Sequence, residues 1–167
     1  MLTPAQLKKA LKEHFDAELA RDVQWICDTV TEDAEYHVIG PHYPDDPVKK
    51  KATAQGREAV RQLWINYFKN FSSYAIQCDE KDMFPLAGEN NENLIFARVS
   101  ITATPANDFE GFPAGKPFSY KTGALCSFAD NGKLTMETVF GSLGQVLMDF
   151  RRMREFLAES ASATKSK

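Results

Sequence analysis

Two runs of alternating residues joined by a tight turn constrain the fold of this chain more than any other feature. The turn, residues 129–132, reads Ala-Asp-Asn-Gly, and Asn and Gly tolerate the positive φ that a β-hairpin needs. Residues 118–128 precede the turn and residues 134–140 follow it. In both runs the residue types alternate with a period of two, so every second side chain is expected on the same face of a strand. The two alternating sets are Phe118, Tyr120, Thr122, Ala124, Cys126 and Phe128, then Leu134, Met136, Thr138 and Phe140. The pattern predicts a pair of half-buried strands against which the rest of the chain packs.

Three amphipathic helices are expected ahead of this hairpin. The first begins with a capping box at residues 3–6 and has an apolar residue at every fourth position, namely Leu7, Leu11, Phe15 and Leu19. His14 and Glu18 lie beside this stripe, one turn apart, at a spacing that allows a hydrogen bond. A second helix is expected over residues 22–30, and a third over residues 56–71.

The remaining segments predict further strands, a loop and a last helix. Strands are expected over residues 35–39, 74–84 and 94–104. Residues 40–54 contain three prolines and are expected to form a long loop. Residues 143–157 carry an apolar stripe typical of an amphipathic helix that docks on its own sheet, over a pocket mouth or on another subunit.

This order of elements predicts an α+β fold. Helices grouped ahead of consecutive strands favour a curved antiparallel sheet wrapped around the N-terminal helices, with a cone-shaped pocket between them and an added C-terminal helix. A chain of 167 residues fits one domain, expected over residues 1–157, with a disordered polar tail over residues 158–167.

The composition of the chain bears on the compartment in which the protein works and on the partners that it can bind. The net charge is −3, so the chain lacks the basic excess that nucleic-acid binding requires. Three cysteines without a CxxC pair favour a reducing compartment, and we expect a cytoplasmic protein. No segment approaches the roughly 20 consecutive apolar residues of a membrane helix.

The chain resembles the SnoaL-like polyketide cyclase family in four stretches. These are residues 19–41, 56–68, 109–118 and 128–140, and they include a Gly-Arg-Glu-Ala-Val helix start and a Gly-x-Pro-x-Gly-Lys-x-Phe bend. That family belongs to the nuclear-transport-factor-2-like superfamily, together with ketosteroid isomerase and limonene epoxide hydrolase. The resemblance extends over about residues 7–147 and implies a cone-shaped fold, a hydrophobic pocket and a homodimer formed through the outer face of the sheet.

The catalytic carboxylates of these relatives do not carry over. The ketosteroid isomerase positions for the base, the tyrosine and the protonated aspartate correspond to Val38, His14 and Ala124. The Arg-x-Asp motif of the epoxide hydrolase corresponds to residues 98–100, which keep the arginine but have serine in place of the aspartate. The acid–base pair of the cyclases also has no counterpart, so any chemistry must use other groups.

Histidine and tyrosine are the remaining candidates for proton transfer near neutral pH. His14 is either a pocket hydrogen-bonding group or a helix residue paired with Glu18. His37 is either a catalytic base or a sheet-surface residue, because strand alternation turns it away from Tyr36. Tyr120 is expected to point into the pocket, where it either donates to an oxyanion or packs. We therefore select His14, His37 and Tyr120 as the catalytic candidates.

A wider set of residues is expected to contact a substrate. These are Phe15, Trp25, Tyr36, Val38, His42, Trp64, Tyr67, Phe68, Arg98, Thr122, Ala124 and Phe140. No metal site is expected, because no two histidines lie four residues apart and no His–Cys cluster is present. The expected chemistry also needs no cofactor.

Three functions fit these features. The first is a cofactor-free enzyme that isomerises, cyclises or dehydrates a hydrophobic, oxygenated small molecule, such as a polyketide- or terpenoid-like intermediate. The second is a binding protein of the same fold with an apolar pocket and no chemistry. The third is an interaction module that uses residues 143–157 to dock on a partner.

Overall fold

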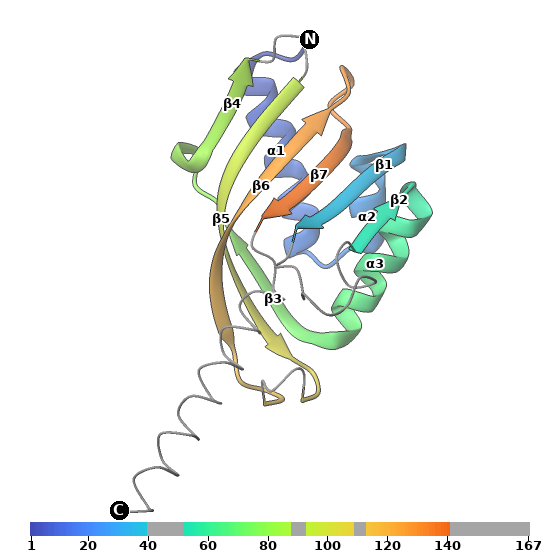
Figure 1. The fold of residues 1–167 in the computed structure, drawn as a ribbon, viewed down its shortest axis with the longest axis vertical. Helices are drawn as coiled ribbons and strands as arrows, with labels where there is room; N and C mark the ends of the chain where they lie inside the picture. Colours follow the sequence, from blue (N-terminus) through green and yellow to red (C-terminus); the bar gives the residue numbers. More distant parts are fainter. Residues whose placement is uncertain (40–51, 88–92, 109–112, 141–167) are drawn as a thin grey trace, which may run out of the picture.

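The computed structural model of the chain describes residues 1–39, 52–87, 93–108 and 113–140 (Figure 1). Its helices are α1 (Pro4–Leu19), α2 (Val23–Asp28), α3 (Arg57–Asn70) and the short 3₁₀ helix η1 (Glu80–Asp82). Its strands are β1 (Val30–Ile39), β2 (Ala52–Gln55), β3 (Phe71–Gln77), β4 (Met83–Ala87), β5 (Asn93–Pro105), β6 (Phe118–Phe128) and β7 (Leu134–Phe140). The predicted hairpin of residues 118–140 is confirmed as β6 and β7.

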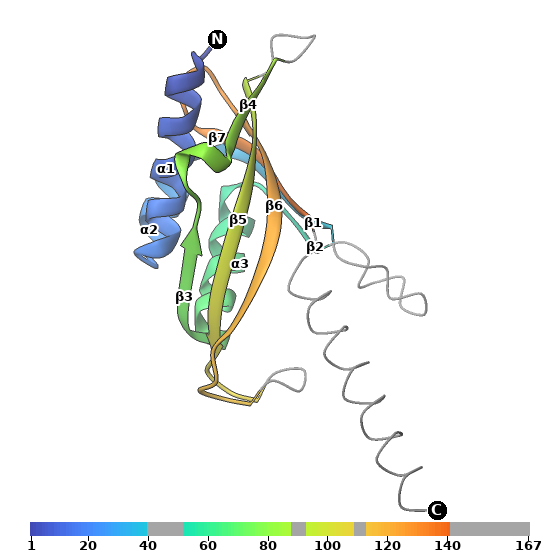
Figure 2. The same ribbon diagram turned by 90° about the vertical axis from the view of Figure 1, so that its left-hand side faces the viewer.

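The strands form one curved sheet in the order β2-β1-β7-β6-β5-β3, and β4 pairs with one end of β5. Figure 2 shows α1, α2 and α3 on one side of this sheet. Helix α1 crosses β3 to β7, whereas α3 packs against β1, β2 and β3. The α+β fold with helices inside a curved sheet is therefore confirmed. The sheet is mixed rather than purely antiparallel, because β1 runs parallel to β7.

Three predicted segments have different boundaries in the structure. The strand expected over residues 35–39 begins at Val30, a residue that was expected to belong to the helix over residues 22–30. The strand expected over residues 74–84 is interrupted, because the charged residues 80–82 form η1 between β3 and β4. The last residues of the expected loop 40–54 belong to β2, which pairs with β1. Residues 40–51 and 141–167, with the predicted C-terminal helix and tail, lie outside the described residues.

Helix α1 starts as predicted and buries Leu7, Leu11 and Phe15 of the predicted stripe, but not Leu19. Thr3 and Gln6 form the reciprocal capping box. Leu19 is 41% exposed, whereas His14 and Glu18 are fully buried. An α-helix has 3.6 residues per turn, so a stripe at every fourth position rotates by about 40° at each step. Over twelve residues the stripe has turned away from the sheet, and the true inner face continues through His14 and Glu18.

None of the helices in the described part of the chain combines the length and the hydropathy that a membrane crossing requires.

Gly56, which precedes α3, holds a backbone conformation that L-residues avoid. Its φ is 85° and its ψ is 151°, and its N–H donates to the carbonyl of Ala34. We predict that Gly56→Ala lowers the free energy of unfolding by about 1–3 kcal/mol, because an added Cβ strains this conformation. Urea unfolding followed by tryptophan fluorescence measures the change. A variant as stable as the parent would contradict the strain.

Candidate active site

A mostly apolar cavity of about 230 Å³ lies between the helices and the concave face of the sheet. Its lining residues are Phe15, Glu18, Tyr36, Leu63, Trp64, Tyr67, Tyr74, Ile76, Val99, Ile101, Tyr120, Ala124, Glu137 and Val139. Six of these residues are aromatic, and Trp64 packs against both Tyr67 and Tyr74 with ring centroids 5.4 and 5.9 Å apart. The wall contains two carboxyl groups, those of Glu18 and Glu137, and they distinguish it from a purely apolar pocket.

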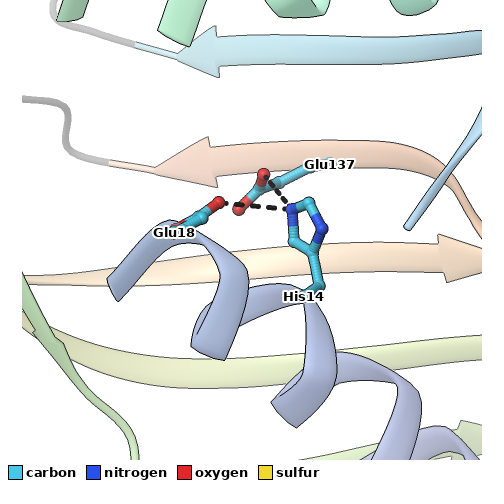
Figure 3. Close-up of side chains that lie close together, drawn as sticks. All are labelled: His14, Glu18 and Glu137. Carbon is cyan, nitrogen blue, oxygen red and sulfur yellow. Dashed lines mark ion pairs between the residues drawn. The ribbon is translucent and has the colours of Figure 1, made fainter. Parts of the chain in front are cut away.

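These two carboxyl groups meet the imidazole of His14 in a buried cluster (Figure 3). The Nε2 atom of His14 lies 3.2 Å from Oε1 of Glu18 and 3.8 Å from Oε2 of Glu137. All three side chains are at least 94% buried. Glu18 and Glu137 line the cavity and His14 lies behind them. The imidazole therefore supports the carboxylates and is not itself part of the cavity wall.

Hydroxyl groups complete the hydrogen bonding of the cluster. The Tyr36 hydroxyl lies 2.7 Å from Nε2 of His14, and the Thr29 hydroxyl lies 2.6 Å from Nδ1. The Tyr74 hydroxyl donates to Oε2 of Glu18 at 3.3 Å. Both ring nitrogens of His14 therefore have partners, as a buried polar side chain requires.

A β-bulge in β7 brings Glu137 to the inner face. Leu134 pairs with Phe128, but Met136 pairs with Ser127, so Thr135 is an extra residue in β7. One extra residue reverses the alternation of faces along the strand that follows. Glu137 would point outward in a regular strand continuing from Leu134, but in the structure it lines the cavity.

The cluster shifts the proton affinities of His14 and Glu18. Burial by itself lowers the pKa of His14, but the hydrogen bonds and charges of Glu137 and Glu18 outweigh burial and raise this pKa to about 9. Burial raises the pKa of the Glu18 carboxyl to about 7, although the hydrogen bond with His14 opposes the shift, and the charge of Glu137 adds to it. Glu18 is therefore a cavity-lining group able to gain or lose a proton near neutral pH.

The raised pKa values predict a fall in stability as the pH rises. His14 has a higher pKa in the folded chain than its ordinary 6.5, so its contribution is complete below pH 6.5 and is lost as the pH rises through about 9. The pKa of Glu18 is raised from its ordinary 4.5 to about 7, so Glu18 also lowers the stability as the pH rises through this range. We expect the free energy of unfolding to fall by an amount on the order of 3 kcal/mol between about pH 6.5 and 9. Urea titrations across this range would contradict the account if stability stayed constant or rose.

Three tyrosines extend the polar lining beyond the cluster. Tyr67 donates a hydrogen bond to the Tyr120 hydroxyl oxygen, and both side chains line the cavity. Burial raises the pKa of Tyr120 to about 12 and that of Tyr74 well above its usual value. Both hydroxyl groups stay protonated at neutral pH. The Tyr74 proton is directed at Glu18, whereas Tyr120 accepts from Tyr67 and has its own proton available for an oxygen atom of a ligand.

His14, Glu18 and Glu137 also have the chemistry of a metal-binding set, since one donor atom from each lies within 4.8 Å of the others. The Nε2 atom of His14 is already in hydrogen-bond contact with the Tyr36 hydroxyl at 2.7 Å. An ion bound to Nε2 would have to displace that hydroxyl. The observed arrangement therefore fits a shared proton better than a cation.

Five of the twelve residues predicted to contact a substrate line the cavity, namely Phe15, Tyr36, Trp64, Tyr67 and Ala124. The catalytic candidate Tyr120 lines it as well. Ala124 and Tyr120 come from β6, and Tyr36 comes from β1. The predicted inward face of β6 thus supplies part of the wall.

Other predicted residues lie elsewhere. Trp25 was expected on the inner wall, but it is 38% exposed on the short helix α2. Phe68 packs against Trp64 under the guanidinium of Arg21, outside the cavity lining. Arg98 and Thr122 border a polar hollow on the opposite face of the sheet, where Arg98 pairs with Asp82.

His37 is placed apart from the cluster. Its Nε2 atom lies 2.9 Å from a carboxylate oxygen of Glu35, two residues earlier in β1, and neither residue lines the cavity. Alternation along β1 explains this position, because Tyr36 takes the inner face. The side chains of Val38 and Phe140, and all of His42, lie outside the described residues.

Sequence reasoning missed several members of the site. Glu137 and Tyr74 were not selected, and Glu18 was considered only as a partner of His14. The His14–Glu18 spacing was a usable signal, since residues four apart in a helix share a face. The sequence carries no such signal for Thr29 or Glu137, because their positions depend on the α2–β1 junction and on the bulge in β7.

The curved sheet and the enclosed helices give the chain the fold of an NTF2-like protein from Burkholderia pseudomallei. The sequence profile of the SnoaL-like domain matches residues 11–136, and the chain belongs to this SnoaL-like family. No curated protein shows significant sequence similarity to the chain.

Solved structures share this fold at low sequence identity. A putative polyketide cyclase from Xanthomonas campestris pv. campestris is 16% identical, with a TM-score of 0.61 over 86% of this chain and 96% of that one. SalBIII, an epoxide hydrolase/cyclase-like enzyme of pyran ring formation in the polyether salinomycin, is 19% identical, with a TM-score of 0.64 over 87% and 97%. Rv0760c from Mycobacterium tuberculosis, in complex with estradiol-17beta-hemisuccinate, is 16% identical, with a TM-score of 0.62 over 86% and 98%.

Proposed function

We propose that this chain is a cofactor-free enzyme that moves a proton on a hydrophobic, oxygenated small molecule bound in the cavity. The observation that carries the proposal is the buried His14–Glu18–Glu137 cluster, whose carboxyl groups border an aromatic cavity. Perturbed titratable groups in an enclosed pocket are typical of catalytic sites. A polyketide- or terpenoid-like substrate suits the aromatic wall, and the cyclase names among the structural neighbours point the same way.

In this proposal Glu18 is the catalytic base. Its carboxylate removes a proton from a carbon next to a substrate carbonyl, and the electron pair moves onto the carbonyl oxygen. Tyr120 donates a hydrogen bond to that oxygen and stabilises the enolate. If the enolate is conjugated with a neighbouring C=C bond, the proton returns from Glu18 to the far carbon of that system, which shifts the double bond and completes an isomerisation. If the substrate carries a β-hydroxyl group, the enolate electron pair instead forms a C=C bond as the C–O bond breaks, and the hydroxyl takes the proton from Glu18 and leaves as water.

His14 has a supporting role. Its imidazolium lies 3.2 Å from the Glu18 carboxylate and 3.8 Å from that of Glu137, where its charge offsets theirs. A proton gained by Glu18 is accommodated because the pKa of this carboxyl is already near neutrality. The two carboxyl groups and the imidazole therefore act as one proton-sharing unit.

Hydrogen–deuterium exchange into an enolisable ketone tests this function without knowledge of the natural substrate. The bicyclic ketone 2-tetralone is incubated with the protein in D₂O, and loss of its α-proton signals is followed by NMR. We expect exchange well above the buffer rate, and unchanged in the presence of EDTA. Tight binding of 2-tetralone without faster exchange would favour the alternative, a binding protein of the same fold.

The homodimer and the cytoplasmic location also remain proposals. The family resemblance implies a dimer formed through the outer face of the sheet, which carries the polar hollow around Arg98. We expect sedimentation equilibrium to give twice the chain mass of 18.8 kDa. A monomer mass at micromolar concentration would rule out a stable dimer.

A further inference from the structure

Thr29 lies where α2 ends and β1 begins, behind the cluster and away from the cavity lining. Its side chain is buried, and its hydroxyl donates to the carbonyl oxygen of Ile26 at 2.7 Å. The same hydroxyl oxygen lies 2.6 Å from Nδ1 of His14. A threonine hydroxyl has a single proton. Because that proton is directed to Ile26, the contact with His14 requires Nδ1 to be the donor.

We propose that Thr29 is a positioning residue that keeps a proton on Nδ1 of His14, so that proton exchange with the cluster takes place at Nε2. The structure places the groups with which Nε2 exchanges around that atom. They are Glu18 from α1, Tyr36 from β1 and Glu137 from β7. The value of this arrangement to catalysis rests on the proposed function, but the protonation pattern itself does not.

The backbone of Thr29 strengthens its positioning role. Its carbonyl oxygen accepts the N–H of Leu134 at 2.9 Å, at the start of β7. Val30 pairs with Leu134 directly before the bulge that turns Glu137 inward. Thr29 thus contacts His14 through its side chain and holds the β7 start, three residues before Glu137, through its backbone.

The two ring nitrogens consequently have different tasks. Nδ1–H donates to Thr29 whether His14 is charged or neutral, so it stays protonated in both states. Nε2 donates toward the carboxylates when His14 is charged and accepts from the Tyr36 hydroxyl when His14 is neutral. Without the Thr29 hydroxyl, a buried Nδ1–H would have no acceptor, and such an unpaired donor is costly. The neutral ring would then favour the other tautomer, with the proton on Nε2 directed at Glu18.

NMR of protein labelled with ¹⁵N-histidine tests this assignment on the intact chain without substrate. The His14 signals are identified by their loss in His14→Gln, and spectra are recorded above pH 9, where neutral His14 is populated. We expect a protonated Nδ1 and a bare Nε2 in the parent protein and in Thr29→Ser, which retains the hydroxyl. We expect Thr29→Val to show the opposite tautomer. Thr31→Val, the same change two residues further along, serves as the control and should keep the parent pattern.

A parent spectrum with the proton on Nε2 would overturn the proposal, as would a Thr29→Val spectrum identical to that of the parent. If Thr29→Val does not fold, the parent and Thr29→Ser spectra still decide the tautomer. Failure of the enzyme proposal has a different signature. In that case 2-tetralone would show no accelerated exchange while the Nδ1-protonated tautomer was still observed.

Discussion

Glu18→Gln is expected to slow deuterium exchange into 2-tetralone by about 10²–10⁴-fold, the range typical of a lost general base. Glutamine has nearly the same shape as glutamate and keeps a polar group at the cavity wall. It cannot accept the substrate proton as a carboxylate does. Folding should be retained, because the change removes one of two carboxylates from a buried cluster. Initial exchange rates by NMR, with circular dichroism as the check on folding, measure the effect.

Glu13 provides the matched control for this prediction. It lies on the same helix, is exposed and does not line the cavity. Glu13→Gln removes the same charge and should exchange at the parent rate. Equal rates for Glu18→Gln and the parent protein would eliminate Glu18 as the base. If the exchange rate fell equally in Glu18→Gln and Glu13→Gln, the loss would come from the change in net charge and not from the position of Glu18.

His14→Leu is expected to lower the free energy of unfolding by about 3–5 kcal/mol at neutral pH, because it removes the cation from a buried cluster of opposite charges. The remaining carboxyl groups of Glu18 and Glu137 then repel each other away from water. Protonation of Glu18 relieves this repulsion, so the deficit should shrink toward pH 5. Urea unfolding at pH 7.5 and pH 5 measures both effects.

A double variant separates this electrostatic cost from a simple packing loss. Adding Glu18→Gln to His14→Leu removes one of the two unopposed carboxylates and should restore part of the stability. In a double-mutant cycle the two changes should therefore be non-additive. A His14→Leu protein within 1 kcal/mol of the parent at neutral pH, or an additive cycle, would contradict the charge coupling.

The main secondary structure was predictable because its signals are local. Residues 118–140 alternate in both strands around an Asn-Gly turn, and the start of α1 carries a full capping box. Local periodicity fixes which residues form each element, but it does not report how an element is rotated or shifted against its neighbours. Leu19 shows the limit for a helix, because a stripe spaced by four drifts around the helix axis.

The site was predicted only in part, for the same reason. Tyr36, Tyr120 and two aromatic residues of α3, Trp64 and Tyr67, follow from regular alternation and helical spacing, and they line the cavity as expected. Glu137 could not be recognised, because the bulge at Thr135 reverses the face of the strand after Leu134. Trp25 shows the opposite error, since a large aromatic residue on a short helix remained partly exposed. The cluster depends on how the strands and helices are aligned against one another, and the residue pattern of a single strand does not contain this information.

The protonation of Glu18 is the most direct measure of the proton-sharing cluster. In protein labelled with ¹³C-glutamate, the side-chain carboxyl signal of Glu18 is identified by its loss in Glu18→Gln and is followed as a function of pH. We predict a midpoint near pH 7, because burial raises the pKa of this carboxyl to about 7. A midpoint between about pH 4 and 5, the range of an ordinary glutamate, would show that Glu18 is fully ionised at neutral pH and would contradict the shared proton.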